Sequence, residues 1–300
     1  MRSIAYITAL NYQKILKRYP QFLDEFNVFK AIFSKYEINL VQQHWQDQNV
    51  NWQSYAGIFL KSCWDYVKNP IQFELFLNHI NDLNLPMINH YQTIRWNMRK
   101  TYLLDLQRQG LSITELLIIP KHSNILDLEN MLSQVFDMHL TDDMLIAKPS
   151  VGMGSSNTIR FNIKELKSHY HLFNKILSYA DLIIQPYSKE LATSGEYSYI
   201  FYNNEFSHAV LKTPKSGDYR CHLIFGAHIA PYEPSLAEID QAYAFISKLN
   251  PQCLYARIDG FKHDNKLILV ELELIEPYLY LEYAEVGSLD RLCKAIIDCL

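Results

Sequence analysis

The sequence predicts an α/β layer in its first third, followed by an antiparallel α+β arrangement. Over residues 1–90, short apolar runs alternate with segments of helical apolar spacing, which is typical of a parallel sheet covered by helices. From about residue 143 the apolar runs lie closer together and are separated by tight turns, which favours hairpins. A chain of 300 residues is long enough for two or three domains with a large buried core.

The first layer is expected to contain four short strands and two helices, since its apolar residues alternate between these two patterns. The expected strands are 3–9, 38–42, 57–61 and 86–89, and the expected helices are 21–34 and 71–83. The polar and aromatic stretch Trp64-Asp65-Tyr66 follows the third strand. It is either part of a substrate wall or a packed tryptophan with a capping aspartate.

After residue 90, the sequence predicts a middle segment and then, from about residue 143, a part rich in hairpins. Asn203-Asn204 and residues 263–265 provide tight turns between apolar runs. The expected helices are 97–109, 124–136, 164–178, 235–249 and 289–300. The expected strands are 116–119, 144–148, 158–161, 182–185, 196–202, 205–212, 256–262 and 266–274.

Composition narrows the class of protein. A net charge of −4 gives no electrostatic reason to expect nucleic acid or an anionic membrane as a partner. No apolar run approaches the roughly 18–20 residues that span a bilayer, and the N-terminus reads as a strand and not as a signal peptide. The 5 cysteines are far apart and lack CxxC spacing. They indicate a reducing, cytoplasmic environment and not a disulfide framework or a zinc site.

A glycine-containing loop follows a lysine in a chain with only 9 glycines. Lys148 ends one expected strand, and Gly152-Met153-Gly154-Ser155-Ser156 leads to the next. The loop has neither the P-loop pattern nor the dinucleotide fingerprint. Its backbone N–H groups could cover a polyphosphate, with the Lys148 charge directed at the same phosphates. The alternative is an ordinary loose hairpin.

Three carboxylates occur on the last expected strand pair. Asp259 lies near the end of one strand, and Glu271 and Glu273 lie two residues apart on the next, so both glutamates face the same side. Such carboxylates repel one another unless a cation lies between them, and Mg²⁺ prefers oxygen ligands of this kind. The alternative is a solvated strand face, with Leu272 and Leu274 inside.

A third segment, 194–220, concentrates charge. Glu196 and Ser198 share one strand face, and Lys212, Lys215 and Arg220 bring three cations into nine residues. This segment predicts a local positive site, or else surface charge on a hairpin and loop.

In this order and spacing, these segments resemble the ATP-grasp superfamily. The motifs that carry the resemblance are WNMRKTYLLDL, AKPSVGMGSSNTIRF, QPY, SGEYSYIFYNNEFSHAVLK, SGDYR and ARIDG…LVELELIEPYLYL. The chain is most similar to glutathione synthetase-like and RimK-like carboxylate–amine ligases, and within them to the group of the O-ureido-serine cyclo-ligase of cycloserine biosynthesis. The resemblance implies an ATP-grasp fold behind a pre-ATP-grasp α/β domain. The implied segments are 1–92 (pre-ATP-grasp), 93–180 (small lobe with the lid loop) and 181–300 (C-terminal lobe with the metal site).

The resemblance also implies a role for each site residue. The nucleotide would be bound by two phosphate-gripping lysines, by the lid loop, by an adenine-side segment and by one of two glutamates at the ribose. Lys212 would reach the triphosphate from the other lobe. Arg220 and Arg257 would lie where negative charge develops on the acyl phosphate and the tetrahedral intermediate. Mg²⁺ (or Mn²⁺) would be held by Asp259, Glu271 and Glu273. The nucleotide set is Lys100, Lys148, Gly152, Gly154, Ser155, Ser156, Gln185, Pro186, Tyr187, and Glu190 or Glu196.

The implied activity is an ATP- and Mg²⁺-dependent carboxylate–amine ligase, or a cyclising ligase, that acts through an acyl phosphate on a small amino-acid-like substrate. Two alternatives stay open. The same site could serve a kinase or a ligase that modifies a peptide or protein, or the chain could bind nucleotide without turnover. Members of the superfamily are often dimers, so a homodimer is also an expectation.

Overall fold

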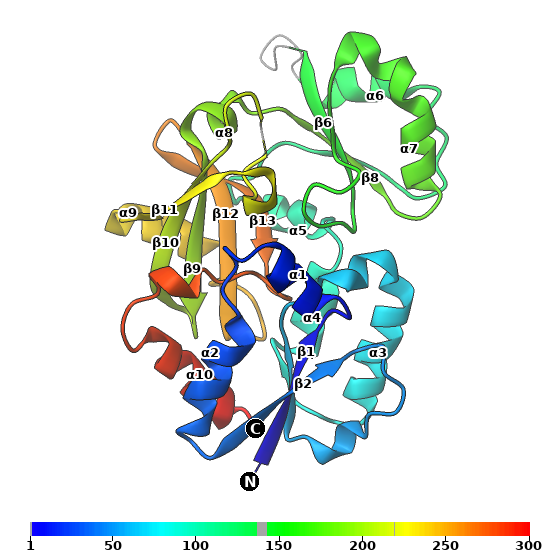
Figure 1. Ribbon diagram of the computed structural model, residues 1–300. Coiled ribbons are helices and arrows are strands. Elements are labelled where there is room, and N and C mark those ends of the chain that lie inside the picture. The colour runs from blue at the N-terminus through cyan, green and yellow to red at the C-terminus, as the bar shows by residue number, and fades with distance from the viewer. Residues whose placement is uncertain (1, 137–142, 219) are drawn as a thin grey trace.

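The computed structural model describes residues 2–136, 143–218 and 220–300, and it contains three sheets (Figure 1). The first sheet is parallel, with the order β2-β1-β3-β4. Helices α2 and α3 accompany it, which confirms the α/β layer that the sequence predicted. The bounds are β1 Arg2–Thr8, α2 Glu25–Ser34, β2 Ile38–His44, β3 Gly57–Leu60, α3 Pro70–Asp82 and β4 Met87–Ile88.

The second sheet is small and antiparallel, with the order β5-β8-β6-β7. Helices α6 and α7 pack beside it and share a buried core with its strands (Figure 1). The bounds are β5 Leu117–Ile119, α6 Leu128–Val135, β6 Met144–Pro149, β7 Ile159–Asn162, α7 Tyr170–Leu177 and β8 Leu182–Pro186, with a 3-10 helix at Ile163–His169. The predicted boundary between residues 180 and 181 falls just before β8. The division at 92 and 180 stays a prediction.

The third sheet is antiparallel and larger, with the order β11-β10-β9-β12-β13. Arg257 pairs with Glu273 and Asp259 with Glu271 across β12 and β13, so the charged residues of both strands lie at one end of the sheet. The bounds are β9 Glu196–Tyr202, β10 Glu205–Thr213, β11 His228–Tyr232, α9 Leu236–Ala244, β12 Tyr255–His263, β13 Lys266–Glu273 and α10 Ser288–Asp298.

The prediction of one helix over 97–109 is wrong. The structure has α4 (Tyr91–Asn97) and α5 (Tyr102–Arg108), separated by a break that contains Lys100. The break is stabilised from outside the segment, because the backbone N–H of Lys100 donates to the carbonyl of Ser150 at 2.7 Å. The apolar spacing continues across the break, so it could not reveal this long-range hydrogen bond.

Besides α4, the sequence did not predict the α-helices α1 (Tyr12–Arg18) and α8 (Lys189–Ser194) or the strand β11. Helices α1 and α8 are short and rich in polar residues, so they have little apolar periodicity. Strand β11 contains Pro231 and pairs only with β10, at the edge of the sheet, where a proline is tolerated.

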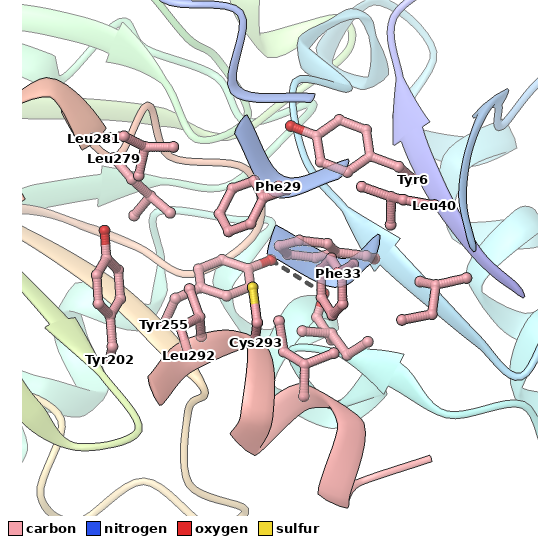
Figure 2. Close-up of a cluster of buried hydrophobic side chains, with 14 of the residues drawn as sticks. Tyr6, Phe29, Phe33, Leu40, Tyr202, Tyr255, Leu279, Leu281, Leu292 and Cys293 are labelled. Atoms are coloured by element: carbon pink, nitrogen blue, oxygen red, sulfur yellow. Dashed lines mark hydrogen bonds between the residues drawn. The ribbon is translucent and has the colours of Figure 1, made fainter. Parts of the chain in front are cut away.

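The first layer and the large sheet share one buried core. Figure 2 shows Tyr6 of β1 and Phe29 and Phe33 of α2 beside Tyr202 and Tyr255 of the large sheet. The hydroxyl of Tyr255 lies 2.6 Å from the carbonyl oxygen of Ile275 and 2.9 Å from that of Leu60. These contacts fix the end of the first layer against the strands that carry the charged residues.

The cysteines and the helix lengths agree with the expectations from composition. The five cysteines are free thiols, and all but Cys299 are buried. No helix within residues 2–136, 143–218 and 220–300 has the length and apolar character needed to cross a membrane.

Candidate functional site

A cavity of about 180 Å³ lies between the small sheet and the large sheet. Strands β6 and β8 line one side, β12 and β13 line the other, and the 152–156 loop contributes part of the wall. Many predicted site residues meet here although they are far apart in sequence. They are Lys100, Lys148, Gly152, Gly154, Ser155, Ser156, Gln185, Pro186, Tyr187, Glu196, Arg220, Asp259, Glu271 and Glu273.

Lys100 connects the loop to the large sheet. Its Nζ lies 2.7 Å from Glu271 Oε1 and donates to the carbonyl of Gly152 at 2.7 Å. The lysine side chain is 12% exposed, so little water competes for these contacts. Burial acts to raise the pKa of Glu271, but Lys100 and Lys148 outweigh it and hold this pKa below the usual value. The pair therefore keeps one cation and one anion at the cavity wall.

Lys148 lies on β6, where alternate side chains face the interior of the small lobe and the cavity. Burial lowers the pKa of Lys148 to about 8, against the effect of Glu271 and with the help of nearby Lys100. A polyphosphate beside both lysines would restore the charged form of Lys148.

Lys212 is buried between two carboxylates. Its Nζ lies 2.6 Å from Glu196 Oε2 and 3.3 Å from Asp259 Oδ2, and Ser198 donates to Asp259 at 2.6 Å. Burial disfavours the lysine charge, but Asp259 and Glu196 outweigh it and raise the pKa of Lys212 above its usual value. Glu196 and Ser198 share a face of β9, as the sequence predicted.

Arg257 joins the carboxylates of β12 and β13. Its guanidinium lies 2.9 Å from Asp259 Oδ2 and 2.5 Å from Glu273 Oε1, and it donates to the carbonyl of Tyr278 at 2.9 Å. Burial acts to raise the pKa of Asp259, but Arg257 and Lys212 lower it well below the usual range. Arg257 and Lys212 both face a second cavity that adjoins the first.

The adenine-side segment lies on and after β8. The side-chain Nε2 of Gln185 is buried and has no hydrogen-bond partner in the part of the chain that the structure describes. Tyr187 donates its backbone N–H to Met144 at 2.9 Å. The orphaned amide beside the cavity fits a ligand that carries hydrogen-bond acceptors, such as a nucleotide base.

The two glutamates suggested for the ribose lie in different settings. Glu190, on α8, contacts His263 Nδ1 at 2.7 Å and is absent from the residues that line either described cavity. Glu196 lines the first cavity but is paired with Lys212. Arg220 also lines this cavity, with its guanidinium 2.7 Å from Asp218 and stacked on Phe225. Tyr219, within the SGDYR motif, lies outside the described residues.

The carboxylates fit a divalent cation in their chemistry. Asp259, Glu271 and Glu273 supply oxygen ligands of the kind that Mg²⁺ prefers. Burial raises the pKa of Glu273 to about 7 against the effect of Arg257, with Glu271 and Asp259 adding to the rise, so this group would gain from a nearby cation. Among the described residues, no three His, Cys, Asp or Glu side chains are grouped closely enough to hold a metal. Lys100 and Arg257 hold the two glutamates instead.

The second cavity contains site residues that the sequence analysis did not single out. Its volume is about 340 Å³, and α1, residues 22–25 and residues 276–280 contribute to its walls. Glu276 lines both cavities and is 9% exposed. Burial raises the pKa of Glu276 well above its usual value. In the sequence, the only indication that Glu276 belongs to the site is its position shortly after Glu271-Leu272-Glu273. The sequence could not show that Glu276 faces a cavity.

Trp64-Asp65-Tyr66 contributes side chains to cavity walls and to packing, and its role in a substrate wall stays a prediction. Trp64 lines the second cavity, and its indole donates to Asn11 at 3.0 Å. Asp65 has a structural role, because it accepts from the Trp45 indole at 2.8 Å and from the Leu10 backbone N–H at 3.1 Å. Tyr66 is buried at the wall of the first cavity.

Comparisons with known proteins show that this chain has the fold of the ATP-grasp ligases. Over the whole chain, the structure superposes on D-alanine–D-alanine ligase from Bacillus anthracis with a TM-score of 0.70 at 13% identity, covering 100% of this chain and 97% of that one. The structure of the ATP-grasp ligase PsnB in complex with a minimal precursor gives a TM-score of 0.65 at 13% identity, with 100% of this chain and 99% of that chain covered.

The particular relatives are more specific. Residues 4–89 match the family model described as the N-terminal domain of D-cycloserine synthetase DcsG. The cycloserine biosynthesis protein DcsG of Streptomyces lavendulae is 24% identical over 285 residues, which cover 85% of this chain and 87% of the relative. The crystal structure of D-cycloserine synthetase DcsG superposes with a TM-score of 0.84 at 20% identity, with 99% of each chain covered. These findings confirm the resemblance and the ATP-grasp fold that the sequence motifs indicated.

Proposed function

We propose that this protein is an ATP- and Mg²⁺-dependent ligase that joins a carboxylate to an amine, within one small amino-acid-like molecule or between two, through an acyl phosphate. The observation that carries the proposal is the clustering of four cations with the β12–β13 carboxylates at two adjoining cavities. The four are Lys100, Lys148, Lys212 and Arg257. Phosphoryl transfer needs positioning and charge neutralisation more than covalent help from the protein.

Support also comes from proteins that share the fold. The B. anthracis D-alanine–D-alanine ligase has been crystallised with ATP, and PsnB with Mg and ADP. One cavity of this chain is lined by the adenine-side residues of β8, by Lys100 and Lys148, and by the three carboxylates, which supports a nucleotide site there. The presence of both lysines and all three carboxylates disfavours a protein that binds nucleotide without turnover.

Each set of side chains has a proposed task. Lys100 and Lys148 would bind the phosphates, and the 152–156 loop would cover them with backbone N–H groups. Asp259, Glu271 and Glu273 would hold Mg²⁺, which when bound neutralises charge on the phosphates. Lys212, Arg220 and Arg257 would stabilise the negative charge that develops on the acyl group.

The bond changes balance without a further reactant. A carboxylate oxygen takes the terminal phosphoryl group of ATP, which leaves ADP. The amine nitrogen then bonds to the acyl carbon as the carbon–oxygen bond to phosphate breaks. Of the two protons that an ammonium nitrogen loses, one stays with the released phosphate and the other passes to water.

Thermal unfolding with ATP plus Mg²⁺, and with ATP alone, tests the nucleotide site. Ligand at about a hundred times its dissociation constant should stabilise the fold by roughly 2.7 kcal/mol. We expect the gain to require Mg²⁺ and to be lost in Glu271→Gln. Glu205→Gln is a matched control, because Glu205 lies at the opposite end of the β9–β10 hairpin from Glu196.

Turnover is tested separately, by ADP and phosphate release over a panel of amino-acid-like carboxylates with and without amines. Release that needs both groups supports the ligase. Release of ADP with a carboxylate alone, giving a stable phosphorylated product, would favour a kinase. Absence of any stabilisation of the wild type at millimolar ATP and Mg²⁺ would refute the proposal.

A further inference from the structure

The second cavity adjoins the proposed nucleotide site and has a wall in common with it. Met153, Gly154, Cys221, His222, Glu273 and Glu276 line both cavities. A molecule in the second cavity could therefore place one of its atoms next to a molecule in the first. At about 340 Å³, the second cavity is within the usual size range of small-molecule sites.

Most of the wall that the second cavity does not share is apolar or aromatic. Tyr19, Phe22, Trp64 and Tyr278 contribute rings, and Ile15 and Leu16 of α1 contribute aliphatic side chains. Such walls favour an aromatic or aliphatic body over a strongly polar one. Aromatic rings also attract cations to their faces.

The charged groups of this cavity differ in whether they have partners. Lys212 and Arg257 are each paired with carboxylates at 2.5–3.3 Å. Glu25 contacts Lys61 at 3.0 Å and accepts from the Leu279 backbone N–H at 2.8 Å. Glu276 is 9% exposed, and in the portions of the chain that the structure describes its carboxylate has neither a hydrogen bond nor an ion pair.

An unpartnered buried carboxylate costs free energy unless a ligand completes it. Burial raises the pKa of Glu276 and so favours its protonated form; a nearby cation would lower this pKa and restore the carboxylate, whereas an anion would raise it further. A neutral body without a donor would leave the group without a partner. An ammonium group would supply the opposite charge and hydrogen-bond donors together.

We infer that the second cavity binds a small primary amine with an aromatic or aliphatic body, and that Glu276 pairs with its ammonium group. The role of this amine as the acceptor in ligation rests on the proposed function. The binding of the amine in the second cavity is independent of that function. Because Glu276 belongs to the wall common to both cavities, the nitrogen would lie next to the site where the acyl phosphate forms.

Calorimetric titration with 2-phenylethylamine tests the inference, without nucleotide. Two matched probes keep the body and change the charge: N-acetyl-2-phenylethylamine is neutral, and 3-phenylpropionate is anionic. We expect the amine to bind at least about tenfold more tightly than either, because only the ammonium can form a charge-assisted pair. Glu276→Gln should remove that preference while the neutral probe binds as before.

Two further variants keep the test decisive. Glu285→Gln removes an exposed carboxylate of the same C-terminal segment that lines neither described cavity, and it should bind the amine like the wild type. Leu16→Trp fills the second cavity from α1 and should block all three probes, even if Glu276→Gln does not fold. Equal binding of the amine and its acetylated form, tighter binding of the anion, or unchanged amine binding in Leu16→Trp would overturn the inference.

Stabilisation by ATP plus Mg²⁺, measured on the same samples, separates this inference from the proposed function. A wild type that binds nucleotide but shows no preference for the amine overturns the amine site alone. A wild type that prefers the amine but does not bind nucleotide overturns the ligase proposal and leaves the amine site.

Discussion

Lys100 Nζ lies 2.7 Å from Glu271 Oε1 at the wall of the first cavity, although the two residues are 171 positions apart in the sequence. The same amine donates to the carbonyl of Gly152, at the start of the glycine loop. One lysine in the break between α4 and α5 therefore links the loop to the strand that carries the proposed metal ligands.

Lys100→Met should weaken nucleotide binding, because it removes a cation from the proposed phosphate site. Contacts to charged groups contribute about 1.5–3 kcal/mol, so the dissociation constant for ATP with Mg²⁺ should rise by roughly one to two orders of magnitude. Fluorescence titration with a labelled ATP analogue measures the change.

Lys167→Met serves as the control, because that lysine is 81% exposed and its one described ion-pair partner, Glu129, is 4.0 Å away. We expect no change in nucleotide affinity there. Equal affinities for Lys100→Met and the wild type would show that Lys100 does not contact the nucleotide.

Gly195 links α8 to β9 and is required for steric reasons. Its φ is +83°, and an added Cβ would lie 2.7 Å from the carbonyl oxygen of Lys212. Gly195→Ala combines a left-handed backbone with this clash, so it should lower the free energy of unfolding by at least about 2 kcal/mol. Urea denaturation measures the loss.

Gly217→Ala isolates the backbone contribution, because Gly217 has a φ of +81° and no atom of the described residues beyond its chain neighbours lies within 4 Å of the added Cβ. Its expected cost is only about 1 kcal/mol. If the two variants lose the same stability, the contact with Lys212 is not the cause.

Lys61 and Glu25 form a buried ion pair at 3.0 Å, in which Lys61 also donates to the carbonyl of Pro277. Either single variant, Lys61→Met or Glu25→Gln, leaves one charged group buried without its partner. Each should lower the free energy of unfolding by about 3–5 kcal/mol.

The double variant Lys61→Met/Glu25→Gln should lose clearly less than the sum of the two, because no charge is then left unpaired. Chemical denaturation of all four proteins gives the coupling. Strictly additive losses would mean that the pair does not interact energetically.

The buried side chain of His208 should make the stability of the folded protein sensitive to acid. Burial lowers its pKa from 6.5 to about 4, and its Nδ1 and Nε2 lie 2.9 Å from the Ser207 hydroxyl and the Leu279 carbonyl oxygen. Between about pH 6.5 and 4 the unfolded chain binds a proton that the folded protein does not, so stability falls as the pH falls. The loss reaches up to about 3 kcal/mol.

Comparison with His208→Gln isolates this contribution from other titrating groups. We expect the difference in unfolding free energy between pH 7 and pH 4.5 to be smaller in the variant than in the wild type. An equal difference in both proteins would assign the acid sensitivity to other residues.

Local sequence patterns were sufficient to predict those features that depend on residues close together in the sequence. The alternating runs of the first third predicted the parallel layer, and the spacing of Glu271 and Glu273 placed both carboxylates on one face of β13. The apolar residues Leu272 and Leu274 are buried on the other face, as strand alternation requires. This geometry agrees with either alternative for the strand, and a metal ion held by Glu271 and Glu273 stays a prediction.

The sequence by itself determined the α/β and α+β layers and the residue types of the proposed phosphate and metal sites. Periodicity and residue type are local properties, so they can be read from a short segment without information on the rest of the chain. Only the tertiary structure decided that Lys100 interrupts a helix, that Arg257 and Lys212 hold the carboxylates, and that Glu276 faces a second cavity. Each of these depends on a hydrogen bond, an ion pair or a wall formed by residues far apart in sequence, which no local pattern records.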